Sequence, residues 1–154
     1  MKFSVIVAAR NESAQIGAAM KRLRHISSAS TMELIIVDGA SDDGTAEAAR
    51  EWSENVIALD SPLRSAQWNA GAEKATGDLL LFLPADVHPP DAWQQALEHF
   101  WLSTPVSAVA ATAFTIEYGA SLPMKLLAAW SNARVRGGAA TTDPGLCPPP
   151  AIFK

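Results

Sequence analysis

The chain has 154 residues and a formal net charge of −4 at pH 7, and 49% of its residues are apolar and 18% charged. This composition predicts one globular domain over residues 1–154 with a real hydrophobic core, and it argues against disorder. The acidic balance differs from the basic surface of nucleic-acid binders, so we expect no nucleic-acid partner.

Cys147 is the only cysteine of the chain, which excludes an internal disulfide and a zinc site built from spaced cysteines. The apolar run near the N-terminus is interrupted by Arg10, Asn11 and Glu12, as expected of a strand and not of a signal peptide. No window approaches the roughly 18 to 20 apolar residues that cross a bilayer. We therefore expect a cytoplasmic protein, a location compatible with peripheral contact at the inner face of a membrane.

The first half of the chain alternates apolar runs with amphipathic stretches. Residues 3–9 are a compact apolar run, typical of a strand that is buried on both faces. From Ile16 to Leu23 apolar residues recur at spacings of three, four and seven, which predicts a helix that ends near Arg24. The same reasoning predicts a strand over residues 34–37, a helix over 45–52 and a strand over 56–59.

The second half continues this alternation. We expect a helix over residues 63–75, with Gly77 as its C-terminal stop, and the strongest strand of the chain over 78–83. Three prolines within residues 84–90 exclude a continued strand and predict a loop. Further predicted elements are a helix from an Asp91 cap to about Leu102, a strand over 106–116 and a helix over 122–136.

At least four strand and helix alternations predict an α/β fold, with a parallel sheet covered by helices on both faces. Polar clusters directly follow three of the strands, at residues 10–12, 38–43 and 84–88. Ligands of such sheets bind beyond the carboxyl ends of the strands. The three loops are therefore expected to converge on one crevice.

Residues 37–45, VDGASDDGT, concentrate carboxylates, glycines and hydroxyls at the end of a buried strand. A tight strand-to-helix turn would explain them, with Asp and Ser capping the next helix and Gly permitting positive φ. Ionised carboxylates also accept strong hydrogen bonds from a ribose hydroxyl or a base N–H. We interpret Asp38 and Ser41 as facing a ligand and Asp43 as capping the helix that begins at Thr45.

Four segments, in this order and spacing, carry a family resemblance: SVIVAARNE, IIVDGASDDGT, QWNAGAEKATGD and LLLFLPADV. They resemble the nucleotide-sugar half of family-two glycosyltransferases of the GT-A fold, and most closely a bacterial subgroup with a His-Ala-Asp sequence after the donor-site strand. The resemblance covers residues 3–90 well and 91–146 more weakly. It implies a GT-A-type, Rossmann-like three-layer sandwich, with a nucleotide-sugar-binding half over 3–90 and a short acceptor half over 91–154.

The resemblance also implies roles for residues of the donor half. Ala8, Ala9 and Glu12 stand where the family holds the base and ribose with backbone groups and a Glu. Arg64 matches a family position that reaches the donor and would bind phosphate through its guanidinium; the alternative is a solvated surface arginine.

Asp86 is the candidate metal ligand, because carboxylates suit the Mg²⁺ or Mn²⁺ that a diphosphate leaving group requires. The wider fold uses an Asp-x-Asp pair, whereas this chain has Pro84-Ala85-Asp86, in which Pro84 replaces the histidine of the subgroup. One carboxylate is enough when the diphosphate and waters complete the coordination shell. His88, two residues on, is either a further ligand or a solvated side chain.

Asp143 resembles the aspartate of an Asp-Gln-Gly-Leu segment that lies near the acceptor in the family, and it would act as the catalytic base. The alternative is an ordinary Asp-Pro turn. On the preceding predicted helix, acceptor or phosphate contacts are expected from Trp130, Asn132, Arg134 and Arg136, with Trp130 equally suited to the core.

Family members continue well beyond this aspartate, whereas this chain ends in a proline-rich tail. Three explanations are left open: a minimal transferase, a truncated product that still folds, or a domain completed by a partner chain. Apolar surface left bare by a missing segment would favour a homo-oligomer.

The sequence therefore predicts a glycosyltransferase that moves a sugar from a nucleotide-diphosphate donor to an unidentified hydroxyl acceptor, inverting and dependent on a divalent metal. The alternative is a catalytically impaired nucleotide or nucleotide-sugar binding module. A third reading, a structural subunit with a vestigial crevice, is disfavoured because Asp38 and Asp86 are both present.

Overall fold

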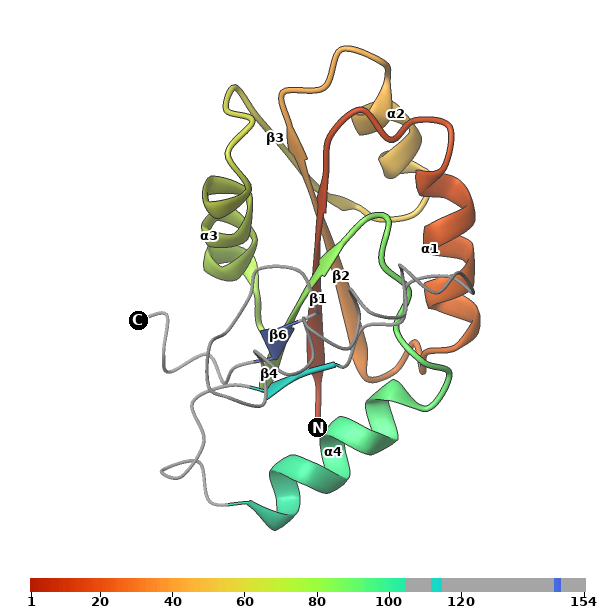
Figure 1. Ribbon diagram of the computed structural model, residues 1–154, viewed down its shortest axis with the longest axis vertical. Helices are drawn as coiled ribbons and strands as arrows, with labels where there is room; N and C mark the ends of the chain where they lie inside the picture. Colours follow the sequence, from red (N-terminus) through yellow and green to blue (C-terminus); the bar gives the residue numbers. More distant parts are fainter. Residues whose placement is uncertain (105–111, 115–145, 148–154) are drawn as a thin grey trace, which may run out of the picture.

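The computed structural model describes residues 1–104, 112–114 and 146–147. Figure 1 shows how strands and helices alternate along the first hundred residues. The elements are β1 (Phe3–Ala9), α1 (Ile16–His25), β2 (Met32–Gly39), α2 (Thr45–Arg50), β3 (Asn55–Leu59), α3 (Arg64–Lys74), β4 (Leu79–Pro84), α4 (Trp93–Ser103), β5 (Thr112–Ala113) and β6 (Leu146–Cys147). The predicted α/β fold class is confirmed.

The strands form one sheet in the order β3-β2-β1-β4-β6-β5. The first four strands of this order are parallel, with Ala9 opposite Asp38 and Ala8 opposite Pro84. Strand β6 runs antiparallel to β4, with Phe82 opposite Leu146. Because β2 and β4 flank β1 on opposite sides, the strand order reverses at β1, and the carboxyl ends of β1, β2 and β4 share one edge of the sheet.

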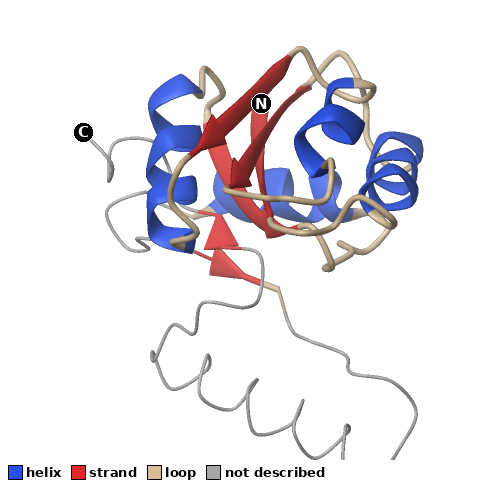
Figure 2. Ribbon diagram, turned by 90° about the horizontal axis from the view of Figure 1, so that it is seen from above, coloured by secondary structure: helices blue, strands red, loops and turns tan. Residues whose placement is uncertain are grey.

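Helices cover both faces of the sheet, as Figure 2 shows from above, with α3 on one side and α1 and α2 on the other. Alternate residues of each strand enter two separate cores. The larger core joins the sheet to α1, α2 and α4 and includes Phe3, Val5, Val7, Ile16, Met20, Leu23, Leu81, Trp93, Leu97 and Trp101. The smaller core lies under α3 and includes Ile6, Ile35, Val37, Leu80 and Phe82. Each fully buried large apolar side chain contributes roughly 1.5–3 kcal/mol relative to an exposed one.

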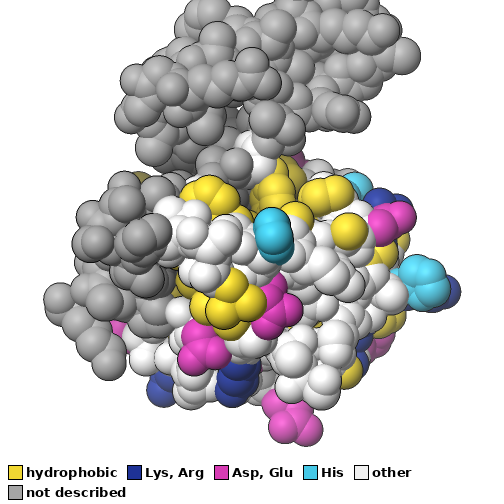
Figure 3. All heavy atoms as spheres, turned by 90° about the horizontal axis from the view of Figure 1, so that it is seen from below, with side chains coloured by type: hydrophobic (Ala, Val, Ile, Leu, Met, Phe, Trp, Pro, Cys, Tyr) yellow, Lys and Arg dark blue, Asp and Glu magenta, His cyan; other side chains and the backbone are white. Residues whose placement is uncertain are grey.

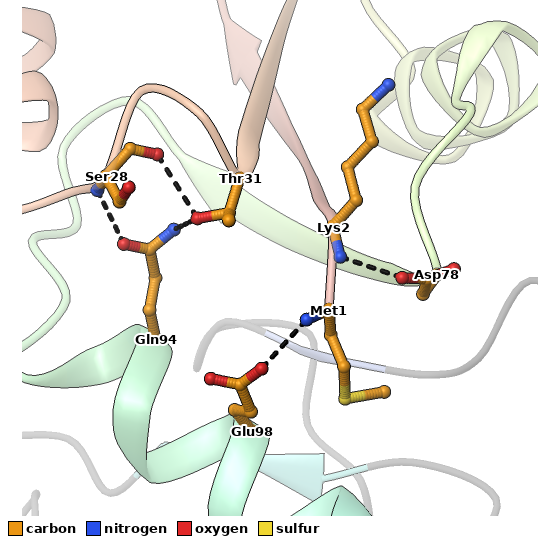
Figure 4. A network of polar contacts seen from close by, with 7 residues as sticks. All are labelled: Met1, Lys2, Ser28, Thr31, Asp78, Gln94 and Glu98. Carbon is orange, nitrogen blue, oxygen red and sulfur yellow. Dashed lines mark hydrogen bonds and ion pairs between the residues drawn. The ribbon is translucent and has the colours of Figure 1, made fainter.

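Helix α4 is attached to the amino end of the sheet by polar contacts, drawn in Figure 4. The Gln94 side chain accepts a hydrogen bond from Ser28 N (2.7 Å) and donates one to Thr31 Oγ1 (3.2 Å). Glu98 pairs with the N-terminal ammonium of Met1 at 2.8 Å, and this hydrogen bond raises the pKa of that ammonium. These bonds set the position of α4 at the end opposite to the carboxyl edge of the sheet.

A polar cluster around Glu33 closes the amino ends of β1, β2 and β4. Burial opposes ionisation of Glu33, but hydrogen bonds from the Ser4 hydroxyl and from both the amide and hydroxyl of Thr76 outweigh it and lower the pKa of this carboxyl. Gly77 N donates to Ser4 Oγ at 2.8 Å. The turn between α3 and β4 is thereby fixed against the first two strands.

Three local predictions are corrected by the structure, and one short strand was not predicted. Helix α2 ends at Arg50 instead of residue 52. Asp91 does not cap α4: it makes an exposed ion pair with Arg22, and Ala92 occupies the N-cap position without a side-chain hydrogen bond. Gly77 is needed for packing, because a Cβ there would lie 2.7 Å from Ser4 N. Strand β6 was not predicted, since two residues are too short to give a pattern. The predicted helix over 122–136 and most of the predicted strand over 106–116 lie outside the described residues.

The end of the molecule seen from below carries acidic and basic side chains among hydrophobic ones (Figure 3). Leu102, near the end of α4, is exposed over 74% of its surface. Among the described residues, no helix combines the length and the apolar character required to span a membrane.

Gly71→Ala tests how closely α3 approaches β1. The added Cβ would lie 2.2 Å from Ile6 Cγ2 in the smaller core, so we expect a loss of roughly 1–3 kcal/mol in the free energy of unfolding, measured by urea denaturation. Gly17→Ala in α1 is the matched control: its nearest neighbour is Trp52 Nε1 at 3.5 Å, and the substitution should be neutral or stabilise by up to about 1 kcal/mol. Equal effects of the two substitutions would contradict the packing described here.

Candidate active site

A pocket of about 220 Å³ opens at the carboxyl edge of the sheet, where the strand order reverses. Three segments line it, namely the end of β1, the start of α3 and the end of β4. The lining residues are Ala8, Ala9, Arg10, Glu12, Pro62, Arg64, Gln67, Pro84, Ala85 and Asp86. The predicted convergence of loops on one crevice is thus found for the loops that follow β1 and β4.

The loop after β1 is joined to the loop after β2 by hydrogen bonds between their main chains and side chains. Asn11 N donates to Ser41 Oγ at 3.0 Å, and Asn11 Oδ1 accepts from Asp42 N at 3.2 Å. Glu12 N donates to Thr45 Oγ1 at 2.8 Å. The two loops therefore form one hydrogen-bonded rim beside the pocket.

Asp43 is the most strongly bonded carboxylate of this rim. It accepts hydrogen bonds from Ser13 N (3.0 Å), Thr45 N (3.0 Å) and the Thr45 hydroxyl. The Thr45 and Ser13 bonds lower the pKa of Asp43 to about 2. The predicted capping role of Asp43 is confirmed by the bond to Thr45 N, although Gly44, with φ 85°, occupies the N-cap position itself.

Asp38 and Ser41 lie at the same edge of the sheet but outside the pocket lining. Asp38 is 4% exposed, and its two carboxylate oxygens accept bonds from the amide and hydroxyl of Ser41. In this arrangement both side chains hold the loop after β2. Direct ligand contact by Asp38 and Ser41 stays a prediction.

The other predicted donor residues line the pocket together: Ala8, Ala9 and Glu12 from β1 and its loop, Arg64 from α3 and Asp86 from the loop after β4. Glu12 also accepts a bond from the Gln15 side chain at the start of α1. Among the described residues no hydrogen bond or ion pair engages the exposed Asp86 carboxylate. Asp143 and the four residues predicted on the helix before it, Trp130, Asn132, Arg134 and Arg136, lie outside the described residues.

Gln67 and Arg10 are pocket residues that the sequence did not single out as ligand-binding. Gln67 is 3% exposed, and its Nε2 donates to Ala9 O at 2.8 Å and to Val37 O at 2.9 Å. Two signals for Gln67 are present in the sequence: a helical spacing of three from Arg64, which places it on the same face of α3, and its position at the start of the family-like segment QWNAGAEKATGD. Arg10 follows β1 directly and was expected only as part of a polar loop.

The resemblance implies a divalent cation, which prefers carboxylate and phosphate oxygen ligands. No group of three or more His, Cys, Asp or Glu within the described residues could hold a metal ion by itself. The pocket does present Asp86 as an exposed carboxylate oxygen donor. This set fits a hard cation whose other ligands come from a bound diphosphate and water.

A mostly parallel sheet with a pocket at its switch point defines an α/β ligand-binding domain. The profile of Glycosyl transferase family 2 matches residues 4–145, and the chain belongs to this family. The fold is the GT-A fold of its structural neighbours.

The similar proteins differ from this chain in length. Glycosyltransferase AglE of Haloferax volcanii is 33% identical over 100 residues, which cover 58% of this chain but only 32% of that protein. A mannosyltransferase of Pyrobaculum calidifontis, in complex with GDP-Man and Mn²⁺, has a TM-score of 0.63 at 23% identity. That match covers 76% of this chain and 36% of the mannosyltransferase chain. Glucosyl-3-phosphoglycerate synthase of Mycobacterium tuberculosis, in complex with Mn²⁺, UDP and glucosyl-3-phosphoglycerate, has a TM-score of 0.69 at 18% identity. That match covers 98% of this chain and 57% of the synthase chain.

Asp43→Asn tests the bonding of the rim through its pH dependence. Because the folded-state pKa of Asp43 is about 2 and its ordinary value is 3.8, its charge stabilises the fold above pH 4, and this stabilisation is lost as the pH falls through about 2. We expect the variant to unfold at lower urea concentration than the wild type at pH 7, with the difference shrinking towards pH 2. Asp42→Asn is the control, since only the main chain of Asp42 is bonded among the described residues. A difference that is independent of pH would contradict this role.

Proposed function

We propose that this chain binds a nucleoside diphosphate sugar in the pocket and transfers the sugar to a hydroxyl acceptor. The observation that carries the proposal is that residues of three family-like segments, Glu12, Gln67 and Asp86 among them, line a single pocket at the switch point of the sheet together with Arg64. The family assignment over residues 4–145 supports the same reaction class. Cytoplasmic location, membrane contact and self-association stay predictions from the sequence.

The donor is proposed to lie across the ends of β1 and β4. Backbone groups of Ala8 and Ala9 and the carboxylate of Glu12 would hold the nucleoside, and Asp38 and Ser41 would keep the neighbouring loop in place. The guanidinium of Arg64 would contact phosphate, because its planar donors match phosphate oxygens. Similar structures that contain UDP or GDP-Man support a uridine or guanosine donor.

Asp86 is proposed as the protein ligand of Mg²⁺ or Mn²⁺. A cation bound there would offset negative charge on the departing diphosphate. The Mn²⁺ in two of the similar structures supports this assignment. The chain itself contributes one carboxylate and leaves room for the diphosphate oxygens.

Asp143 is proposed as the general base of an inverting displacement. Its carboxylate would take the proton of the acceptor hydroxyl while that oxygen forms a bond to the anomeric carbon, and the bond from this carbon to the diphosphate oxygen breaks with its electrons leaving on the diphosphate. The match to the family profile, which extends to residue 145, supports the assignment.

A nucleotide-sugar binding module without turnover is the second candidate. It is favoured by the side chain of Pro84, which lies in the pocket lining and can supply neither a hydrogen bond nor a metal ligand. Release of nucleoside diphosphate when hydroxyl acceptors are added separates the two candidates. Binding with no release under any acceptor would leave the module as the function.

The donor and metal assignments are tested by a thermal-shift panel of UDP, GDP, UDP-glucose and GDP-mannose with and without Mg²⁺ or Mn²⁺. A ligand bound only by the folded state raises the melting temperature according to its concentration relative to its dissociation constant. We expect a cation-dependent shift in the wild type, lost in Asp86→Asn and retained in Asp91→Asn, whose carboxylate lies outside the pocket. A donor that binds wild type and Asp86→Asn equally well with metal would exclude the metal role.

Asp143→Asn should spare donor binding and lower the rate of transfer on the order of 100- to 10,000-fold, the usual contribution of a general base. Donor affinity is measured by calorimetry and transfer by release of nucleoside diphosphate in the presence of acceptor. The control is again Asp91→Asn, which should change neither quantity. Loss of affinity and of rate together would show that Asp143 is not a base.

A further inference from the structure

Gln67 is a buried amide between two strand ends and the pocket. It is 3% exposed, lies one turn into α3, and its Nε2 donates to Ala9 O at the end of β1 and Val37 O near the end of β2, at 2.8 and 2.9 Å. Both protons of its nitrogen are thereby used. No other side chain bridges β1 and β2 in this way among the described residues.

These two bonds fix which end of the amide faces which way. A carbonyl oxygen only accepts hydrogen bonds, so the amide nitrogen must point to Ala9 and Val37, and a flipped amide would place three oxygens together. Gly39 provides the space, because a Cβ there would lie 2.6 Å from Gln67 Nε2. The oxygen Oε1 is therefore held in one orientation.

Oε1 is left as an acceptor in the wall of the pocket. Gln67 is a lining residue of that pocket, and no hydrogen bond reaches Oε1 from any described residue. Among the described residues the buried side-chain atoms without a partner do not include Oε1, so this oxygen is open to water or ligand at the pocket wall, and a ligand that displaces the water without donating a hydrogen bond loses free energy. The orientation is maintained by the fold, so the pocket presents this acceptor before any ligand arrives.

We propose that Gln67 determines nucleoside specificity, with Oε1 accepting a hydrogen bond from an N–H or O–H group of the donor's nucleoside. This inference rests on the proposed function. Phosphate oxygens are themselves acceptors and would be repelled, so the partner of Oε1 is a base N–H or a ribose hydroxyl. Gln67 is bonded to β1 and β2, whereas Asp86 follows β4 on the other side of β1, which separates the nucleoside end from the diphosphate end of the donor.

The same amide also positions the strand ends, so a substitution alone cannot distinguish the two roles. A double-mutant-type cycle, in which one change is made in the protein and the other in the ligand, isolates the binding free energy of this contact. A purely structural effect of the substitution does not depend on which ligand group is removed. Gln67→Met keeps the length of the side chain and removes both its donors and its acceptor. Gln94→Met is the matched control: Gln94 is also buried and makes two hydrogen bonds, but at α4, far from the carboxyl edge.

The experiment is calorimetric titration of each protein with UDP and GDP, in Mg²⁺, and with analogues that each lack one donor. N3-methyl-UDP and N1-methyl-GDP lack the ring N–H, and the 2′-deoxy forms lack a ribose hydroxyl. We expect wild type and Gln94→Met to bind the parent nucleotide roughly 5- to 150-fold more tightly than one of its analogues, the range for leaving a buried acceptor unpaired. Gln67→Met should bind parent and that analogue equally. The analogue that shows the loss identifies the donor group.

The outcomes separate this inference from the proposed function. If neither UDP nor GDP binds the wild type, both are overturned. If the parent nucleotide binds and its preference over every analogue is unchanged in Gln67→Met, only the role of Gln67 is overturned. Should Gln67→Met fail to fold, NMR of the wild type labelled with ¹³C-glutamine replaces it. We expect the Gln67 side-chain carbonyl resonance to shift with the parent nucleotide and not with the discriminating analogue. Equal shifts with both ligands overturn the inference.

Discussion

The carboxyl edge of the sheet depends on one constraint, that backbone polar groups left over by the ladder must find partners. Strands β1 and β2 run side by side, and Gln67 of α3 donates to the carbonyl groups of Ala9, the last residue of β1, and of Val37, two residues before the end of β2. Asn11 and Ser41 join the loops that follow. Of the side chains that stabilise this edge, Gln67 also forms part of the wall of the pocket.

Two residues in left-handed conformations show how tightly these loops turn. Asn11 has φ 55° and Ala40 has φ 56°. Asparagine adopts this region readily, whereas an alanine there is strained by contact of its Cβ with the backbone. The strain at Ala40 persists because its neighbours are fixed on both sides, by the Asp38 to Ser41 bonds and by the Ser41 to Asn11 bond. Such positions are enriched at ligand sites, where the surrounding structure dictates the backbone.

The sequence predicted what depends on short-range pattern. Spacing alone identified Ile16, Ala19, Met20 and Leu23 as the buried face of α1, and all four are buried. The apolar runs located the four parallel strands because such strands are covered on both faces. The parallel sheet and the meeting of the loops after β1 and β4 followed from the connection rules for parallel strands, whereas the order of the strands was not predicted.

Short-range sequence patterns did not predict contacts between residues that are distant in the sequence. Three glycines leave room where a Cβ would meet a distant residue: Gly39 beside Gln67, Gly71 beside Ile6 and Gly77 beside Ser4. The residues that surround these glycines in the sequence do not indicate such neighbours. Gln67 itself resembles any polar residue of an amphipathic helix until β1 and β2 are placed beneath it. Asp91 illustrates the opposite error, since a residue with a good capping side chain faces Arg22 instead. Tertiary packing, not local preference, decides each of these cases.

The charges of the pocket explain why a donor and a cation should bind together. Its lining carries two arginines, Arg10 and Arg64, and two carboxylates, Glu12 and Asp86, so their formal charges cancel. A diphosphate alone would gain from the arginines but would be repelled by the carboxylates, and a cation alone would find a single exposed carboxylate at Asp86. When both enter, each supplies what the other lacks, because phosphate oxygens complete the ligand shell of the cation and the cation neutralises their charge. Under the proposed function each ligand must therefore raise the affinity for the other by the same factor, as linkage requires.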